Sequence, residues 1–166
     1  GDSAMAGAIH FYTKKNIQTK ISTTSGNYGV SQTSASVGIN DEKIDLNISL
    51  DNSKHDGFHK AATGGVKDKG KQTKSSIGGT YTTDGGTEIS LDLYRTNSDI
   101  RYPNYLSDAQ FEADPTGSGS GSRYTYRDAE SSTTNFKVKR NWGENFEFTT
   151  NRSAIDKESR NFYSYS

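Results

Sequence analysis

The sequence predicts an all-β protein, and three observations lead to that prediction. Apolar and polar residues alternate with a period of two in several stretches, no stretch of comparable length shows the three-four apolar repeat of a helix, and polar turn signals separate the stretches. Only 29% of the 166 residues are apolar, which leaves little for a conventional core, yet aromatic residues make up 11% and argue against disorder. We therefore expect strands with one apolar and one polar face.

The alternation is clearest in Lys43–Asp51, where every even position from Ile44 to Leu50 is apolar and every odd position is polar. Successive side chains of a strand point to opposite faces, so this segment is predicted to be a strand. The same pattern recurs at Ala35, Val37 and Ile39, at Ile89, Leu91 and Leu93, at Phe136 and Val138, and at Phe146 and Phe148. In order, the predicted strands cover approximately residues 8–13, 17–25, 30–40, 43–55, 72–82, 87–97, 123–142, 145–155 and 158–165.

The connections differ in length. Tight polar breaks at 26–29, 40–43, 83–86 and 143–144 contrast with longer segments at about 56–71 and 97–122. From about residue 30 onward short and long connections alternate, and in a meander alternate connections lie at opposite ends of the sheet. Short turns at one end and long loops at the other are typical of outer-membrane barrels.

The pattern leaves more than one architecture open. In a β-sandwich the apolar faces of two sheets cover each other, and a solenoid is a further alternative. In a transmembrane barrel the apolar row faces lipid and the polar row lines an aqueous or filled interior, so no dry protein core is required. Strands of about 10–13 residues also suit a tilted bilayer crossing.

We therefore predict an antiparallel transmembrane β-barrel segment, a meander with short periplasmic turns and long extracellular loops. The predicted membrane-facing residues are Ile44, Leu46, Ile48, Leu50, Ile89, Leu91, Leu93, Phe136, Val138, Phe146 and Phe148. By the same alternation Tyr124 and Tyr126 are predicted to belong to an aromatic girdle, and Trp142 to the opposite membrane interface.

Composition excludes several functions. Twenty basic and twenty acidic residues give zero net charge, which disfavours a nucleic-acid partner, and the lack of Cys excludes disulfides, thiol nucleophiles and Cys-ligated zinc. No apolar run of 18 residues predicts a transmembrane helix, and no signal peptide is visible, so we expect a mature, excised or engineered chain. His55 and His59 lack further ligands and are predicted to be solvated loop residues rather than a metal site. We expect no catalytic residues, no enzyme activity and no cofactor.

The segment Tyr94–Tyr105 combines aromatic rings with guanidinium groups, which suits anionic or catecholate-like ligands through charge-assisted hydrogen bonds and cation–π contacts. The same residue types are also ordinary at the upper rim of a barrel. Alternation places Asp92 and Tyr94 opposite Leu93, toward the lumen. The candidate ligand-binding residues are Asp92, Tyr94, Arg101, Tyr102 and Tyr105.

The first fifteen residues read GDSAMAGAIHFYTKK. Small residues spaced as Gly1, Ala4 and Gly7 precede an alternating strand with Ile9 and Phe11, closed by Thr13–Lys15. This stretch resembles the segment that ends the plug domain of TonB-dependent outer-membrane receptors, and the residues up to about 105 resemble the opening barrel strands of that family.

The resemblance implies that residues 1–15 are the C-terminal end of a plug domain and that 16–166 are a β-barrel segment of about eight strands. It implies uptake of a scarce nutrient, such as a ferric siderophore, haem, cobalamin or an oligosaccharide, bound at extracellular loops. The implied partners are outer-membrane lipid and a TonB-type energising protein, acting through a plug absent from this sequence, and the implied location is the cell outer membrane.

Members of that family have 22 strands and outer-membrane barrels end in an aromatic residue, so we expect the chain to be a fragment. The alternative function is a secreted or surface-exposed β-rich binding or adhesion module. The Gly-Ser alternation at Gly117–Ser122 is compatible with a natural extracellular loop, an engineered replacement, or a sequence approximated from density.

Overall fold

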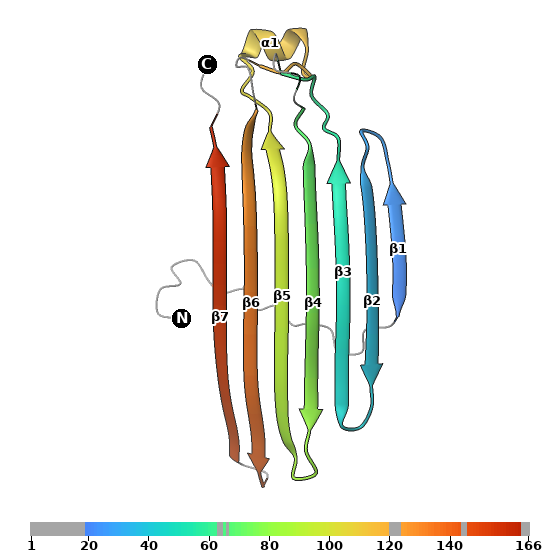
Figure 1. Ribbon diagram of the computed structural model, residues 1–166, viewed down its shortest axis with the longest axis vertical. Helices are drawn as coiled ribbons and strands as arrows, with labels where there is room; N and C mark the ends of the chain where they lie inside the picture. Colours follow the sequence, from blue (N-terminus) through green and yellow to red (C-terminus); the bar gives the residue numbers. More distant parts are fainter. Residues whose placement is uncertain (1–18, 63–64, 66, 120–123, 144–145, 164–166) are drawn as a thin grey trace.

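The computed structural model describes residues 19–62, 65, 67–119, 124–143 and 146–163, which form a single antiparallel sheet and one short helix (Figure 1). Each strand pairs with the next along the chain, so the predicted all-β antiparallel meander is confirmed. The elements in order are β1 (Lys20–Ser25), β2 (Ser31–Asn40), β3 (Ile44–His55), β4 (Gly70–Thr82), β5 (Thr87–Tyr102), α1 (Asp108–Ala113), β6 (Thr125–Trp142) and β7 (Phe146–Phe162).

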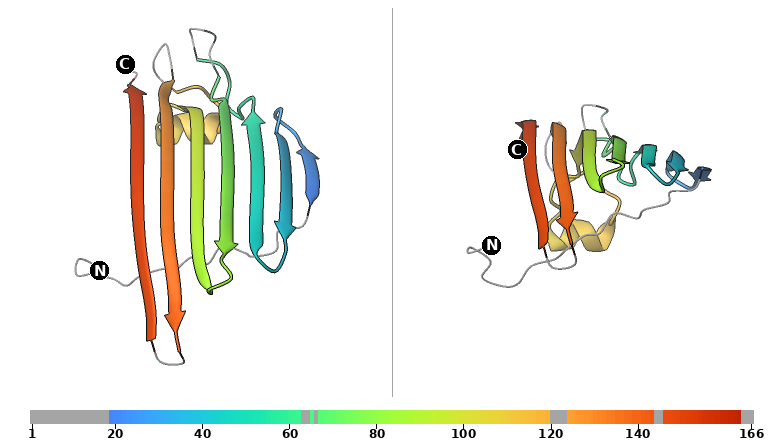
Figure 2. Two further views of the ribbon diagram at one scale, coloured as in Figure 1. Left: turned by 60° about the horizontal axis from the view of Figure 1, so that its bottom comes forward. Right: turned by 90° about the horizontal axis from the view of Figure 1, so that it is seen from below.

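The sheet is not closed into a barrel. Within the described residues β1 and β7 each have a partner on one side only, and they form the two edges of one curved layer with α1 on one side (Figure 2). That this sheet is a segment of a transmembrane barrel therefore stays a prediction. The strand predicted for 8–13 and the plug segment predicted for 1–15 lie outside the described residues.

The C-terminal end of the sheet differs from the predicted strands. Two strands were expected at 145–155 and 158–165, but Phe146–Phe162 is one continuous strand that pairs with β6 from Trp142 to Tyr126. The charged run Asp156–Glu158 resembles a turn in the sequence, yet a partner strand of 18 residues supplies hydrogen bonds along its whole length. The described residues therefore contain seven strands, where about eight were expected.

The two ends of the sheet differ as the sequence predicts. The β2–β3 and β4–β5 connections are tight turns at the lower end, closed by backbone hydrogen bonds such as Gly86 N to Thr83 O at 2.9 Å. The β3–β4 and β5–β6 connections are long loops at the upper end, which also carries α1 (Figure 1). The alternation of short turns and long loops is thus confirmed in the part of the chain that the structure describes.

Strand register gives the sheet two chemically distinct faces. Val37 lies opposite Ile48, Ile48 opposite Ile77, and Ile77 opposite Leu93, and directly opposed residues point to the same side. We call this side the apolar face and the other side the polar face. All the residues predicted to face the membrane lie on the apolar face: Ile44, Leu46, Ile48, Leu50, Ile89, Leu91, Leu93, Phe136, Val138, Phe146 and Phe148.

The apolar face has no protein cover among the described residues. Ile48 is 42% exposed, Leu91 is 47% exposed and Phe136 is 43% exposed. The few buried side chains, Ala62, Tyr124 and Asp68, belong to the upper loops instead. A β-sandwich requires a second sheet over this face, so that alternative is wrong for the described part of the chain.

The apolar stretch slants across the sheet. The row of opposed residues that starts at Val37, the middle of the apolar stretch of β2, runs to Ala154 on β7. The apolar pair of β7, Phe146 and Phe148, lies about seven residues below Ala154, and β7 is five strands away from β2. With ~3.3 Å per residue and ~4.8 Å between strands, the apolar stretch therefore slopes by about 45° across the sheet.

The lower ends of the strands step down in the same direction, from β2 to β6 (Figure 1). A band that is level in a bilayer then requires strands tilted by about 45°, close to the tilt of about 35–45° in transmembrane barrels.

Candidate functional site in the upper loops

The β3–β4 loop (56–69) and the β5–β6 loop (103–124) are fastened together around Lys60. Its backbone N–H donates to Thr116 O at 2.7 Å, its Nζ lies 2.6 Å from Asp114 Oδ2, and its carbonyl oxygen accepts a hydrogen bond from the Tyr124 hydroxyl. Tyr124 is fully buried by this packing, which raises the pKa of its hydroxyl, and nearby Asp68 adds to the rise. The prediction of Tyr124 as a girdle residue is therefore wrong, because a loop covers it.

Asp68 holds the beginning of the β3–β4 loop in place. Its nearly buried carboxylate accepts hydrogen bonds from the backbone N–H groups of His59 at 3.0 Å and Phe58 at 3.3 Å, and its Oδ2 lies 2.7 Å from His59 Nδ1. The prediction that His59 is a solvated loop residue is therefore wrong, because its ring is bonded to the carboxylate of Asp68. The described residues include no group of three or more His, Cys, Asp or Glu residues arranged to hold a metal ion.

A cavity of about 450 Å³, which we call the loop pocket, opens beside this cluster. One wall is α1, whose start is fixed by a capping box in which Ser107 Oγ accepts from Gln110 N and Gln110 Oε1 accepts from Ser107 N. The lining residues are His59, Pro103, Asn104, Tyr105, Leu106, Asp108, Phe111, Glu112 and Pro115. The pocket therefore combines aromatic and other apolar surface with carboxylates.

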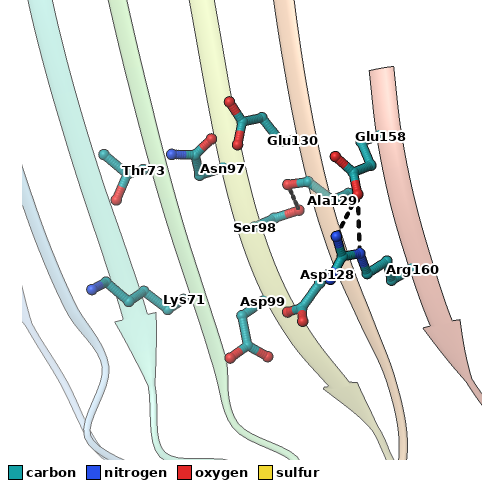
Figure 3. A pocket seen from close by; sticks show the side chains of 10 residues that line it. All are labelled: Lys71, Thr73, Asn97, Ser98, Asp99, Asp128, Ala129, Glu130, Glu158 and Arg160. Atoms are coloured by element: carbon teal, nitrogen blue, oxygen red, sulfur yellow. Dashed lines mark hydrogen bonds and ion pairs between the residues drawn. The ribbon is translucent and has the colours of Figure 1, made fainter.

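A second cavity, of about 430 Å³, is a charged groove on the upper half of the sheet (Figure 3). Asp99 lies directly opposite Asp128, and Glu130 lies directly opposite Glu158, on the same side of the sheet as the apolar band. Glu130 is paired with Arg95, and Glu158 is paired with Arg160 at 2.8 Å, yet so many charged groups are costly away from water. The groove therefore marks the upper limit of the apolar surface. Its lining residues are Lys71, Thr73, Asn97, Ser98, Asp99, Asp128, Ala129, Glu130, Glu158 and Arg160.

The five candidate ligand-binding residues do not form one site. Asp92, Tyr94 and Tyr102 lie on the polar face of β5, with Asp92 and Tyr94 adjacent to each other on it. Arg101 lies on the opposite face, with its guanidinium 5.5 Å from the centre of the Tyr126 ring. Only Tyr105 lines the loop pocket, and it is 96% exposed.

Sequence reasoning missed most of the loop pocket. His59 and Phe111 are 52 positions apart in the sequence and are brought together only by the contacts of Lys60 and Tyr124 between the two loops. The one local signal was the Ser107-to-Gln110 spacing of a capping box, which indicates a helix start.

Comparisons of this chain with protein-family models, curated proteins and solved structures find no match. The described part of the chain contains no helix that is long and apolar enough to cross a membrane. The resemblance to TonB-dependent receptors consequently stays a prediction.

Replacing Gly57 by Ala is expected to loosen the β3–β4 loop. Gly57 has φ +93°, and an added Cβ lies 2.9 Å from the backbone carbonyl oxygen of Asp68. Gly65 also has a positive φ, +78°, but has open space around it. We expect Gly57→Ala to lower the local opening free energy at the amides of Phe58 and His59 by about 1–3 kcal/mol more than Gly65→Ala, measured by hydrogen exchange. Equal effects of the two variants contradict the packing described for Asp68.

The Lys60–Asp114 pair predicts a pH dependence of the loop packing. Hydrogen bonds from Lys60 and then from Thr116 lower the pKa of Asp114 to about 2. This carboxyl has a lower pKa in the folded than in the unfolded chain. Its contribution to the stability of the loop packing is therefore complete above the ordinary pKa of about 3.9, and it is lost as the pH falls toward about 2.

We expect the protection factor of the Thr116 amide, corrected for intrinsic exchange, to fall between about pH 4 and pH 2. The fall is expected to disappear in the Asp114→Asn variant. It is expected to persist in the control variant Asp84→Asn, which removes a carboxylate at the lower end of the sheet. A wild-type profile identical to that of Asp114→Asn refutes the assignment.

Proposed function

We propose that this chain is a β-barrel segment of an outer-membrane receptor that imports a scarce nutrient, with the upper loops binding that nutrient. The observation that carries the proposal is the slanted apolar band on a sheet whose other face is polar. A slope of about 45° is the geometry that a level lipid belt imposes on tilted barrel strands. A sheet that simply packs on another protein layer has no such requirement.

The energetics of the apolar face support the same conclusion. Complete removal of a large apolar side chain from water contributes about 1.5–3 kcal/mol. Ile39, Leu91 and Phe136 lie in one row of opposed residues and are 54%, 47% and 43% exposed among the described residues. Acyl chains can cover a surface of this shape without any further protein core.

The directions of the edge strands favour a larger ring. β1 and β7 run the same way (Figure 1), so joining them directly makes a parallel pair of a 6-residue with a 17-residue strand. An antiparallel ring instead needs an odd number of additional strands, which gives the even total of bacterial outer-membrane barrels. A larger barrel with long upper loops is also what the resemblance to TonB-dependent receptors implies.

In this proposal the nutrient is of the kind such receptors import, for example siderophore-bound iron, haem or cobalamin. A TonB-type protein supplies energy through a plug domain, and the chain itself performs no chemical step. The long upper loops face the outside of the cell, and the short lower turns face the periplasm. The loop pocket is the part of the described structure best suited to first contact with a ligand, because it is concave and rich in aromatic surface.

Extraction behaviour tests the membrane assignment. We expect the full-length protein that contains this chain, expressed in a bacterium with an outer membrane, to fractionate with that membrane and to leave it only with detergent. Its gel migration is expected to change on heating, as it does for folded membrane barrels. A monodisperse monomer obtained without detergent contradicts the assignment and favours the secreted binding module.

Two adjacent residues test which face contacts lipid. Phe136 lies on the apolar face opposite Leu91, and Asn135 lies on the polar face opposite Asp92. In the full-length protein reconstituted in phospholipid vesicles, we expect Phe136→Arg to lower the unfolding free energy by about 2–4 kcal/mol. Asn135→Arg is expected to change it by less than about 0.5 kcal/mol, since it faces a carboxylate across the strands. Urea titration measures both, and equal losses contradict the assignment of faces.

A further inference from the structure

We propose that the loop pocket binds a positively charged organic ligand that contains a planar ring, and that it discriminates against anionic ligands. The inference rests on the proposed function for the biological role of the ligand, since it specifies the class of nutrient. The chemistry of the pocket itself is independent of whether the sheet below it lies in a membrane.

Exposed aromatic rings form the apolar part of the pocket. Tyr105 is 96% exposed and Phe111 is 55% exposed, and neither makes a ring contact within the described residues. Pro103 and Pro115 add rigid apolar surface at the two ends of the segment that carries α1. Open aromatic faces held by an ordered loop can stack on a planar ring and attract a cation.

Apart from His59, whose side chain is directed to Asp68, the charged side chains that line the pocket are acidic. Asp108 and Glu112 are four residues apart on α1 and so project from the same side of the helix, where two negative charges repel each other. Neither Lys nor Arg lines the pocket, and Lys60, from the same loop as His59, is engaged by Asp114 at 2.6 Å. A cation bound between the two carboxylates relieves their repulsion, whereas an anion increases it.

The arrangement differs from the chemistry expected from the sequence. Arg101 was the cationic group predicted to contact an anionic or catecholate-like ligand, but it lies on the apolar face of β5 beside Tyr126 and does not line the pocket. The side chain of His59, the one basic group in the lining, is directed to the carboxylate of Asp68. The described pocket therefore offers no free guanidinium or ammonium group to an anion.

The volume is compatible with such a ligand. A cavity of about 450 Å³ lies within the range of roughly 300–1,000 Å³ of small-molecule sites. It is large enough for a tricyclic ring system with small substituents.

Two dyes with the same xanthene ring and opposite charge test the proposal. Rhodamine 123 is a cation and fluorescein is an anion at neutral pH. We measure the fluorescence anisotropy of each dye against the purified full-length protein that contains this chain, in micelles of an uncharged detergent, with empty micelles as the blank. The variants are Phe111→Ala and the double variant Asp108→Asn/Glu112→Gln. Glu42→Gln, in the exposed β2–β3 turn, is the control for a lost surface charge.

We expect rhodamine 123 to bind and fluorescein to bind at least about tenfold more weakly. The affinity for rhodamine 123 is expected to fall about tenfold in the double variant and severalfold in Phe111→Ala, and to stay unchanged in Glu42→Gln. Added salt is expected to weaken binding to the wild type more than to the double variant.

The inference is overturned if fluorescein binds as tightly as rhodamine 123, or if neither dye binds. It is also overturned if the pocket variants bind rhodamine 123 as tightly as the wild type does, while their change in gel migration on heating shows that they are folded. A chain that needs detergent but fails this test overturns the ligand class alone. A chain that is soluble without detergent and still prefers rhodamine 123 overturns the membrane assignment alone.

Discussion

The sheet depends on what covers its apolar face. Strand pairing satisfies the backbone groups between neighbouring strands, but it leaves rows of Ile, Leu and Phe side chains without a second protein layer in the described residues. A chain with only 29% apolar residues has little else to bury. Under the proposed function lipid resolves this problem, because a bilayer supplies the apolar environment that other folds obtain from their own core. The low apolar content and the exposed rows then have the same cause.

The upper loops obtain their order in a different way. They hold the few buried side chains of the described structure, and polar contacts through Asp68, Lys60 and Tyr124 connect the two long loops. Between these loops and the apolar band lies the charged groove, whose carboxylates and cationic side chains favour contact with water. Along the strands the protein thus changes from tight turns, through an apolar band and a polar surface, to an ordered loop cluster with a concave pocket. Such a sequence of layers is suited to a protein that contacts lipid below and a ligand above.

The sequence predicted the parts of this arrangement that depend on local pattern. Alternation at Ile44–Leu50 and the tight breaks at 40–43 and 83–86 were sufficient for most strands and for both faces. The continuous strand β7 was missed because a charged run such as Asp156–Glu158 resembles a turn until the partner strand is known. The loop pocket was missed because His59 and Phe111 meet only through tertiary contacts. Arg101 was assigned to a ligand by residue type, whereas its position on β5 directs it to the apolar face.

The depth of spin labels in a bilayer tests the central claim most directly. The chain has no Cys, so single Cys variants at Val37, Ala154 and Phe148 can each be labelled in the full-length protein, cleared of any Cys outside this chain, and reconstituted into vesicles. Relative accessibility to oxygen and to a nickel chelate then reports the depth of each label. The slanted band predicts that the labels at Val37 and Phe148 lie at similar depth in the acyl chains. The label at Ala154, although in the same hydrogen-bonded row as Val37, is predicted to lie nearer the water. Equal depth for Val37 and Ala154, or water exposure of all three labels, contradicts a lipid-facing sheet with tilted strands.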